Sequence, residues 1–101
     1  MEDMIDLGRV GELGAKSVEL DLSEFSEFGS GEYHLLHQRA NDTGPYEVDD
    51  IQVSGGKLIW NVSAFDTAYV GVGKAEIRLQ GDDFLVKSDI YLTRVYAALE
   101  R

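Results

Sequence analysis

The stretch that decides the fold is residues 70–88, which read VGVGKAEIRLQGDDFLVKS. From Lys74 to Gln80, apolar and polar residues alternate strictly, which is the period of a strand with one buried and one exposed face. The apolar positions are Ala75, Ile77 and Leu79. Gly81 and the two aspartates after it are residues that form tight turns, and a second extended segment follows them. The stretch therefore predicts a β-hairpin.

Segments on both sides of this hairpin show similar short extended patterns. Further strands are predicted at residues 5–9, 17–22, 32–39, 46–53, 57–62 and 89–96. The segment 46–53 is expected to be one strand bent at Asp49-Asp50. Ser23 is expected to cap a single helical turn within residues 23–28. In the last strand both alternating rows are apolar, which predicts either burial on both sides or a kink at Lys87-Ser88.

About seven strands separated by short polar turns, with no long helical pattern, predict an all-β protein built as an antiparallel β-sandwich. A small barrel is the main alternative. A length of 101 residues suits one domain, so residues 1–101 are expected to form a single sandwich.

The chain is acidic: 19 aspartates and glutamates outnumber 9 lysines and arginines, and the net charge is −10. This charge repels nucleic-acid phosphates and anionic lipid surfaces, so neither a nucleic acid nor a membrane is expected as a partner. There are no cysteines, which excludes disulfides and cysteine ligands for metals. The first six residues are acidic where a signal peptide is basic, and no long apolar run follows. We therefore expect a protein that is made and assembled in the cytoplasm.

Few residues suggest catalysis or ligand binding. His34 and His37 are three positions apart on a predicted strand, so they face opposite sides and cannot share a metal ion. The pairs Asp49-Asp50 and Asp82-Asp83 match no calcium-loop pattern and are expected to be solvated turn residues. The glycines of residues 71–73 lack the third glycine of a dinucleotide-binding loop and are expected to allow close packing. No catalytic residue, metal or cofactor is therefore predicted.

Several segments together resemble those of a known family. They are residues 5–9, 35–39, 60–62, 66–67, 86–88, 94–95 and, most of all, the motif GVGKAEIR at 71–78. In these segments the chain resembles the N-terminal β-sandwich domain of tail and baseplate structural proteins of bacteriophages from Gram-positive hosts, such as baseplate upper proteins. The resemblance implies an immunoglobulin-like fold without catalytic residues, in a non-enzymatic virion or prophage protein that docks a tail, baseplate or fibre component. The chain would then be the first domain of a longer protein, or a docking protein by itself.

The resemblance also implies which partners to expect. They are other virion structural proteins and, as candidate homo-oligomers, a trimer or a hexamer. Alternation places four apolar residues outside the core: Leu36, Ile59, Ile90 and Leu92. These four residues are the candidate partner-facing patch.

A carbohydrate-binding module is the alternative function, and it requires exposed aromatic residues in a row or groove. Trp60 alternates in phase with Leu58 and Val62, which favours a core position over a sugar-stacking one. The exposure of the aromatic residues separates the two hypotheses. The residues to compare are Trp60, Tyr33, Tyr46 and Tyr91.

Overall fold

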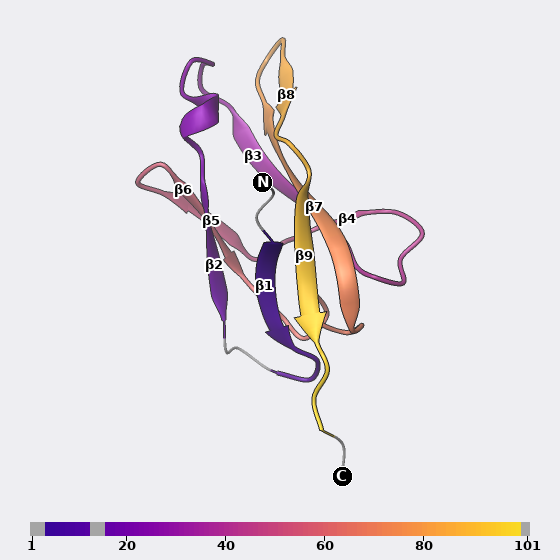
Figure 1. Ribbon diagram of the computed structural model, residues 1–101. Coiled ribbons are helices and arrows are strands. Elements are labelled where there is room, and N and C mark those ends of the chain that lie inside the picture. Colours follow the sequence, from indigo (N-terminus) through magenta and orange to yellow (C-terminus); the bar gives the residue numbers. More distant parts are fainter. Residues whose placement is uncertain (1–3, 13–15, 100–101) are drawn as a thin grey trace.

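The computed structural model describes residues 4–12 and 16–99, which are built almost entirely of β-strands (Figure 1). In these residues the strands are β1 (Met4–Arg9), β2 (Ser17–Asp21), β3 (Glu32–Gln38), β4 (Tyr46–Glu47), β5 (Ile51–Ser54), β6 (Lys57–Asn61), β7 (Gly71–Gln80), β8 (Leu85–Lys87) and β9 (Tyr91–Tyr96). One 3₁₀ turn, η1 (Ser23–Phe25), lies where the sequence predicts a helical turn, but the predicted cap is wrong, because Ser23 is the first residue of the turn and no side chain caps it. The all-β prediction is confirmed. The described residues hold nine strands against a predicted count of about seven, and the segment 46–53, predicted as one strand, is divided into β4 and β5.

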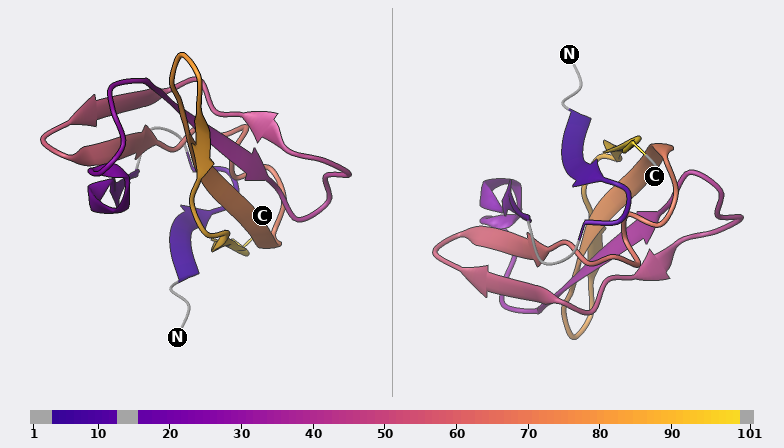
Figure 2. Two further views of the ribbon diagram at one scale, coloured as in Figure 1. Left: turned by 90° about the horizontal axis from the view of Figure 1, so that it is seen from above. Right: turned by 90° about the horizontal axis from the view of Figure 1, so that it is seen from below.

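The strands form two sheets that lie against each other as the layers of a sandwich (Figures 1 and 2). The larger sheet has the order β1-β9-β7-β3-β4, with β8 on the end of β7, and the smaller sheet has the order β2-β6-β5. The predicted sandwich is confirmed, and β9-β7-β3 and β2-β6-β5 follow the strand order of immunoglobulin-like domains. The sandwich is antiparallel except at one edge, where β1 pairs in parallel with β9. Short turns force neighbours to run antiparallel, but β1 and β9 come from opposite ends of the chain, so no local pattern shows their direction.

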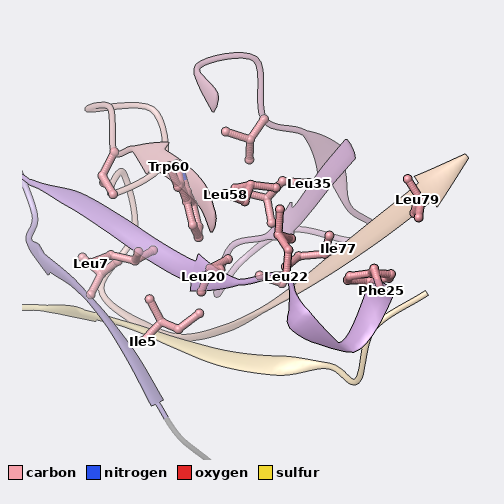
Figure 3. Packing of buried hydrophobic residues seen from close by; sticks show 14 residues of the cluster. Ile5, Leu7, Leu20, Leu22, Phe25, Leu35, Leu58, Trp60, Ile77 and Leu79 are labelled. Atoms are coloured by element: carbon pink, nitrogen blue, oxygen red, sulfur yellow. The ribbon is translucent and has the colours of Figure 1, made fainter. Parts of the chain in front are cut away.

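The core lies between the two sheets, where their inward-facing side chains meet (Figure 3). The alternation predicted for β7 is confirmed, because Ala75, Ile77 and Leu79 are almost fully buried. From the smaller sheet, Leu58 and Trp60 point into the same space, and both have 0% exposed surface. Burial of these large apolar side chains is the main force that holds the two layers together.

The segment 46–53 is not one bent strand, so that prediction is wrong. β4 pairs with β3 in the larger sheet, whereas β5 pairs with β6 in the smaller sheet. Asp49-Asp50 lies in the connection that crosses from one layer to the other. Alternation shows which residues face a core, but a core between two sheets is shared, so alternation does not show which sheet a strand joins. The predicted turn between residues 53 and 57 is confirmed, with positive φ at Gly55 and Gly56, as a two-residue hairpin requires.

The kink predicted at Lys87-Ser88 is confirmed as a break between β8 and β9. Both strands pair with β7, but their registers differ by one residue, which marks a β-bulge at residues 88–90. The Ser88 hydroxyl accepts a hydrogen bond from the Ile77 backbone N–H at 2.9 Å, so that buried donor keeps a partner. The extra residue also places Tyr91 opposite Ala75, and Ile90 is left exposed.

Close packing explains the glycine that β7 carries near its start. A Cβ atom on Gly73 would lie 2.3 Å from the Gln38 carbonyl oxygen and 2.8 Å from Thr93 Oγ1. Both neighbouring strands therefore approach this point more closely than any side chain allows. The expectation that the glycines of residues 71–73 permit close packing is confirmed.

Candidate functional site

The candidate patch divides between the two sides of the sandwich. We call the side of the larger sheet that faces away from the smaller sheet the outer face. Leu36 lies there on β3 and Leu92 on β9, because their neighbours His37 and Thr93 face inward. Ile59 instead lies on the opposite surface of the molecule, since it belongs to the smaller sheet. The structure brings Leu36, Leu92 and Ile90 to one side and does not bring Ile59 to them.

A shallow hollow of about 140 Å³ lies on the outer face between Leu36 and Ile90. Its lining is more apolar than polar and includes charged side chains from β7. The other residues that line it are Gln38, Pro45, Lys74, Ala75, Glu76 and Arg78. An apolar depression with a polar rim is the usual form of a small protein-binding site.

The paired strand positions of the outer face carry balanced charge. Five of its side chains are cations, namely Arg9, Lys74, Arg78, Lys87 and Arg94, and four are carboxylates, namely Asp6, Glu32, Glu47 and Glu76. With Asp89 of the bulge included, the face has no net charge in a chain of net charge −10. Nearly all of the excess negative charge therefore lies on other surfaces.

Some charges of the outer face are paired within the chain. Arg78 Nε donates to Glu76 Oε1 at 2.7 Å. His34 bonds to Glu47 through Nδ1 and lies 3.6 Å from Glu32 through Nε2. The bond to Glu47 raises the pKa of His34 above its ordinary value. These pairs are accessible to solvent and can exchange partners.

The outer face also has exposed apolar side chains beside the charged ones. The register places Met4, Val72, Leu85 and Tyr96 there together with Ile90, and all of them are exposed. The corresponding face of the smaller sheet is polar around the half-buried Ile59, with Glu19, Gln52 and Lys57 beside it. The two outer surfaces of the sandwich therefore differ in their apolar content.

A second cluster, a buried polar network, was not predicted from the sequence. Its centre is Asp66, which lies in the connection between β6 and β7 and is 3% exposed. One carboxylate oxygen accepts from Trp60 Nε1 at 3.1 Å and from the Ser63 N–H and hydroxyl at 2.8 and 3.0 Å. The Asp66 N–H returns a bond to the Ser63 hydroxyl at 3.3 Å. This reciprocal pair is a capping box, so the spacing Ser63-x-x-Asp66 was the signal in the sequence.

The network continues across the larger sheet through His37, which is 1% exposed. Tyr46 donates its hydroxyl proton to Asp66, so His37 Nδ1, at 2.8 Å from the Tyr46 oxygen, must be the donor of that bond. The other nitrogen, Nε2, then accepts from the Thr93 hydroxyl at 3.3 Å. Burial lowers the pKa of His37 to about 4, so the ring is neutral, as this bonding pattern requires. Burial and the bond to Asp66 raise the pKa of Tyr46.

The network contains residue types that occur in catalytic relays, but its polar groups are hydrogen-bonded to one another. Thr93 and His37 are each 1% exposed, which leaves no room for a substrate at that end. At the other end, Asp66 and Phe65 line a hollow of about 390 Å³ together with Glu47, Asp49 and Asp50. Among residues 4–12 and 16–99, no three histidines, cysteines or carboxylates gather closely enough to hold a metal ion. The arrangement is suited to joining the two sheets through hydrogen bonds.

An arginine anchors the loop that follows β3 to the same region. The Arg39 guanidinium donates from Nε and Nη2 to the Asp42 carboxylate, each at 2.8 Å, and from Nη1 to the Phe65 carbonyl oxygen at 3.1 Å. It also lies over the Phe65 ring, 4.0 Å from the centroid, and over the Tyr69 ring at 4.8 Å. Phe65 therefore has a structural partner although much of it is exposed.

The aromatic residues do not form a sugar-binding platform around Trp60. Trp60 is fully buried and donates to Asp66, as the core interpretation of this residue predicts. Tyr33, Tyr46 and Tyr91 are half-buried, and Tyr33 and Tyr46 pack edge-on against Phe25 and Phe65. Trp60 is therefore not available for stacking on a sugar ring.

A scan against models of protein families finds no family that matches this chain, and a search of curated protein sequences finds no significant relative. The resemblance to phage baseplate domains stays a prediction. Within the part of the chain that the structure describes, no helix is long and apolar enough to cross a membrane.

Proposed function

We propose that this chain is a non-enzymatic assembly module that docks another protein on the outer face of its larger sheet. The observation that carries the proposal is the combination found there: an apolar hollow between Leu36 and Ile90, further exposed apolar side chains, and balanced charge in a strongly acidic chain. Protein-binding surfaces combine an apolar centre with a polar rim in this way.

The closed form of the polar network supports a structural role over an enzymatic one. The histidine, tyrosine and aspartate that a reaction would need already hold the two sheets together. The resemblance to baseplate proteins suggests the setting, which is a virion assembled in the host cytoplasm with other virion structural proteins as partners. Docking of a tail, baseplate or fibre component is then the function of the domain.

The test is capture of partners from lysates of cells that produce the virion, with each bound protein identified by mass spectrometry. Three forms are compared: the natural chain, Ile90→Glu on the outer face, and Val53→Glu as a matched control. Ile90 and Val53 are aliphatic residues of similar exposure, 54% and 48%, but Val53 belongs to the edge strand of the smaller sheet. A virion structural protein should bind the natural chain and Val53→Glu but not Ile90→Glu.

Equal binding by all three forms would show that the outer face is not the docking surface. Binding of glycans on an array, with no bound protein that depends on Ile90, would favour the carbohydrate-binding alternative instead. A buried charge without a partner strongly weakens an apolar contact, so the Ile90→Glu effect should be large where Ile90 is at the centre of the interface.

A further inference from the structure

We infer that the outer face binds a second copy of this chain, so that two domains pair through their larger sheets. This inference rests on the proposed docking function and names its partner. It depends on three features of the outer face: its charge, its exposed apolar residues and its size.

Charge favours the outer face as a surface for self-pairing. Two copies of a chain with net charge −10 repel each other, and acidic surfaces placed together would add to that repulsion. The outer face brings five cations and four carboxylates at its paired positions. Lys74 and Lys87 are not ion-paired within the described residues, so their ammonium groups are free to meet carboxylates of the other copy. Self-pairing here avoids the like-charge contact that the acidic surfaces would impose.

Exposed apolar residues provide the attraction. Five of the large apolar side chains that the structure leaves exposed lie on this face: Met4, Val72, Leu85, Ile90 and Tyr96. Leu36 and Leu92 lie between them and are half-buried. Removal of this area from water stabilises a complex in proportion to the area buried.

The size of the face fits a modest dimer. The strands of the larger sheet hold 34 residues, so at roughly 3.3 Å per residue and 4.8 Å per strand the face covers on the order of 500 Å². Stable interfaces bury about 800 Å² on each partner, and weaker ones bury less. We therefore expect a dimer that dissociates on dilution.

Pairing of one surface with itself produces a two-fold dimer, because the same patch is used by both copies. A trimer or a hexamer in a ring requires two different complementary surfaces. The inference thus predicts a dimer and differs from the trimer or hexamer that the baseplate resemblance suggests.

The test is the solution mass of the purified chain by sedimentation equilibrium from micromolar to millimolar concentration. The mass should rise from 11.2 kDa to twice that value. Ile90→Glu should raise the dimer dissociation constant by roughly tenfold or more, whereas Val53→Glu should leave it within about twofold. Added salt up to physiological strength should tighten the dimer, because screening weakens the repulsion between the two acidic copies.

A chain that stays monomeric over this range would overturn the inference. The docking proposal would then depend on capture of a different protein, which the Ile90→Glu comparison reports separately. A dimer that is weakened by Val53→Glu and not by Ile90→Glu would place the contact on the smaller sheet and would also overturn it. A defined trimer or hexamer would overturn two-fold pairing through one face.

Discussion

The polar side chains on the two faces of the larger sheet come from the same strands but are bonded in different ways. On β3, His37 faces inward and every polar atom of its ring has a partner, while His34 faces outward and pairs with carboxylates at the surface. The pKa values of the two histidines shift in opposite directions for this reason. The comparison shows where polar groups fix a structure and where they remain free to meet a partner. Substitutions on the inner face should change stability, and those on the outer face should change binding.

Asp66→Ala should have the largest effect on stability. The substitution leaves the Trp60 N–H, the Ser63 N–H and the Tyr46 hydroxyl without their acceptor inside the protein. Each orphaned donor destabilises by about 1–3 kcal/mol, so we expect a loss of roughly 3–5 kcal/mol in the free energy of unfolding. Urea denaturation followed by Trp60 fluorescence measures this loss in the free energy of unfolding.

Asp82→Ala is the matched control for Asp66→Ala, because it removes an exposed carboxylate from the turn between β7 and β8. This change should stay within about 0.5 kcal/mol. Equal and small losses for the two variants would mean that the buried network does not hold the sheets together.

Acid should destabilise the domain through His37. Its pKa is about 4 in the folded protein against 6.5 for an ordinary histidine, so the unfolded chain takes up the proton first. Stability is therefore fully present above pH 6.5 and falls as the pH drops toward 4, by roughly 3 kcal/mol. The charged and titratable groups that act on the ring are Asp66, Asp42 and Arg39, with Tyr46 bonded to it.

The measurement compares the natural chain with His37→Gln, since both share the same carboxylates. The difference in unfolding free energy between them should change across this pH window, and parallel curves would contradict the prediction. His34 has the opposite sign: its pKa is raised, so its contribution is present at low pH and is lost as the pH rises through that raised pKa. That contribution should be small, because the His34 pairs lie at the surface.

The sequence predicted which side of each strand is buried better than it predicted how the strands pair. Alternation correctly placed Ala75, Ile77, Leu79 and Trp60 inside, because a side chain's direction along a strand is a local property. The parallel pairing of β1 with β9 and the change of sheet at Asp49-Asp50 depend on contacts between distant segments. No local pattern could show either one.

The same limit applies to the candidate sites. Alternation placed Leu36, Ile59 and Leu92 outside the core, but it could not show that Ile59 belongs to the opposite surface. The buried network was missed because its members are distant in sequence: Thr93, His37 and Tyr46 are linked to one another and to Asp66 only in the folded chain. Only the short Ser63-x-x-Asp66 spacing was visible beforehand.

Ser88→Ala should have a smaller effect on stability. It tests whether the bulge at residues 88–90 keeps Ile90 on the outer face. The Ser88 hydroxyl satisfies the Ile77 N–H inside the sheet, and the bulge that it supports leaves Ile90 exposed beside the hollow. Loss of the hydroxyl leaves one buried donor without a partner, so we expect a loss of about 1–2 kcal/mol. Ser54→Ala, in an exposed position at the end of β5, is the control.

Ser88→Ala should also weaken dimer formation, although Ser88 is itself buried and touches no partner. Without its hydrogen bond the bulge can slip by one residue, and in the register of β8 the residue opposite Ala75 would be Ile90 rather than Tyr91. Ile90 would then turn inward and leave the outer face. In Ser88→Ala we therefore expect both a higher dimer dissociation constant by sedimentation equilibrium and faster amide hydrogen exchange at Ile77. A variant that loses protection at Ile77 but dimerises like the natural chain would show that the bulge supports the core alone.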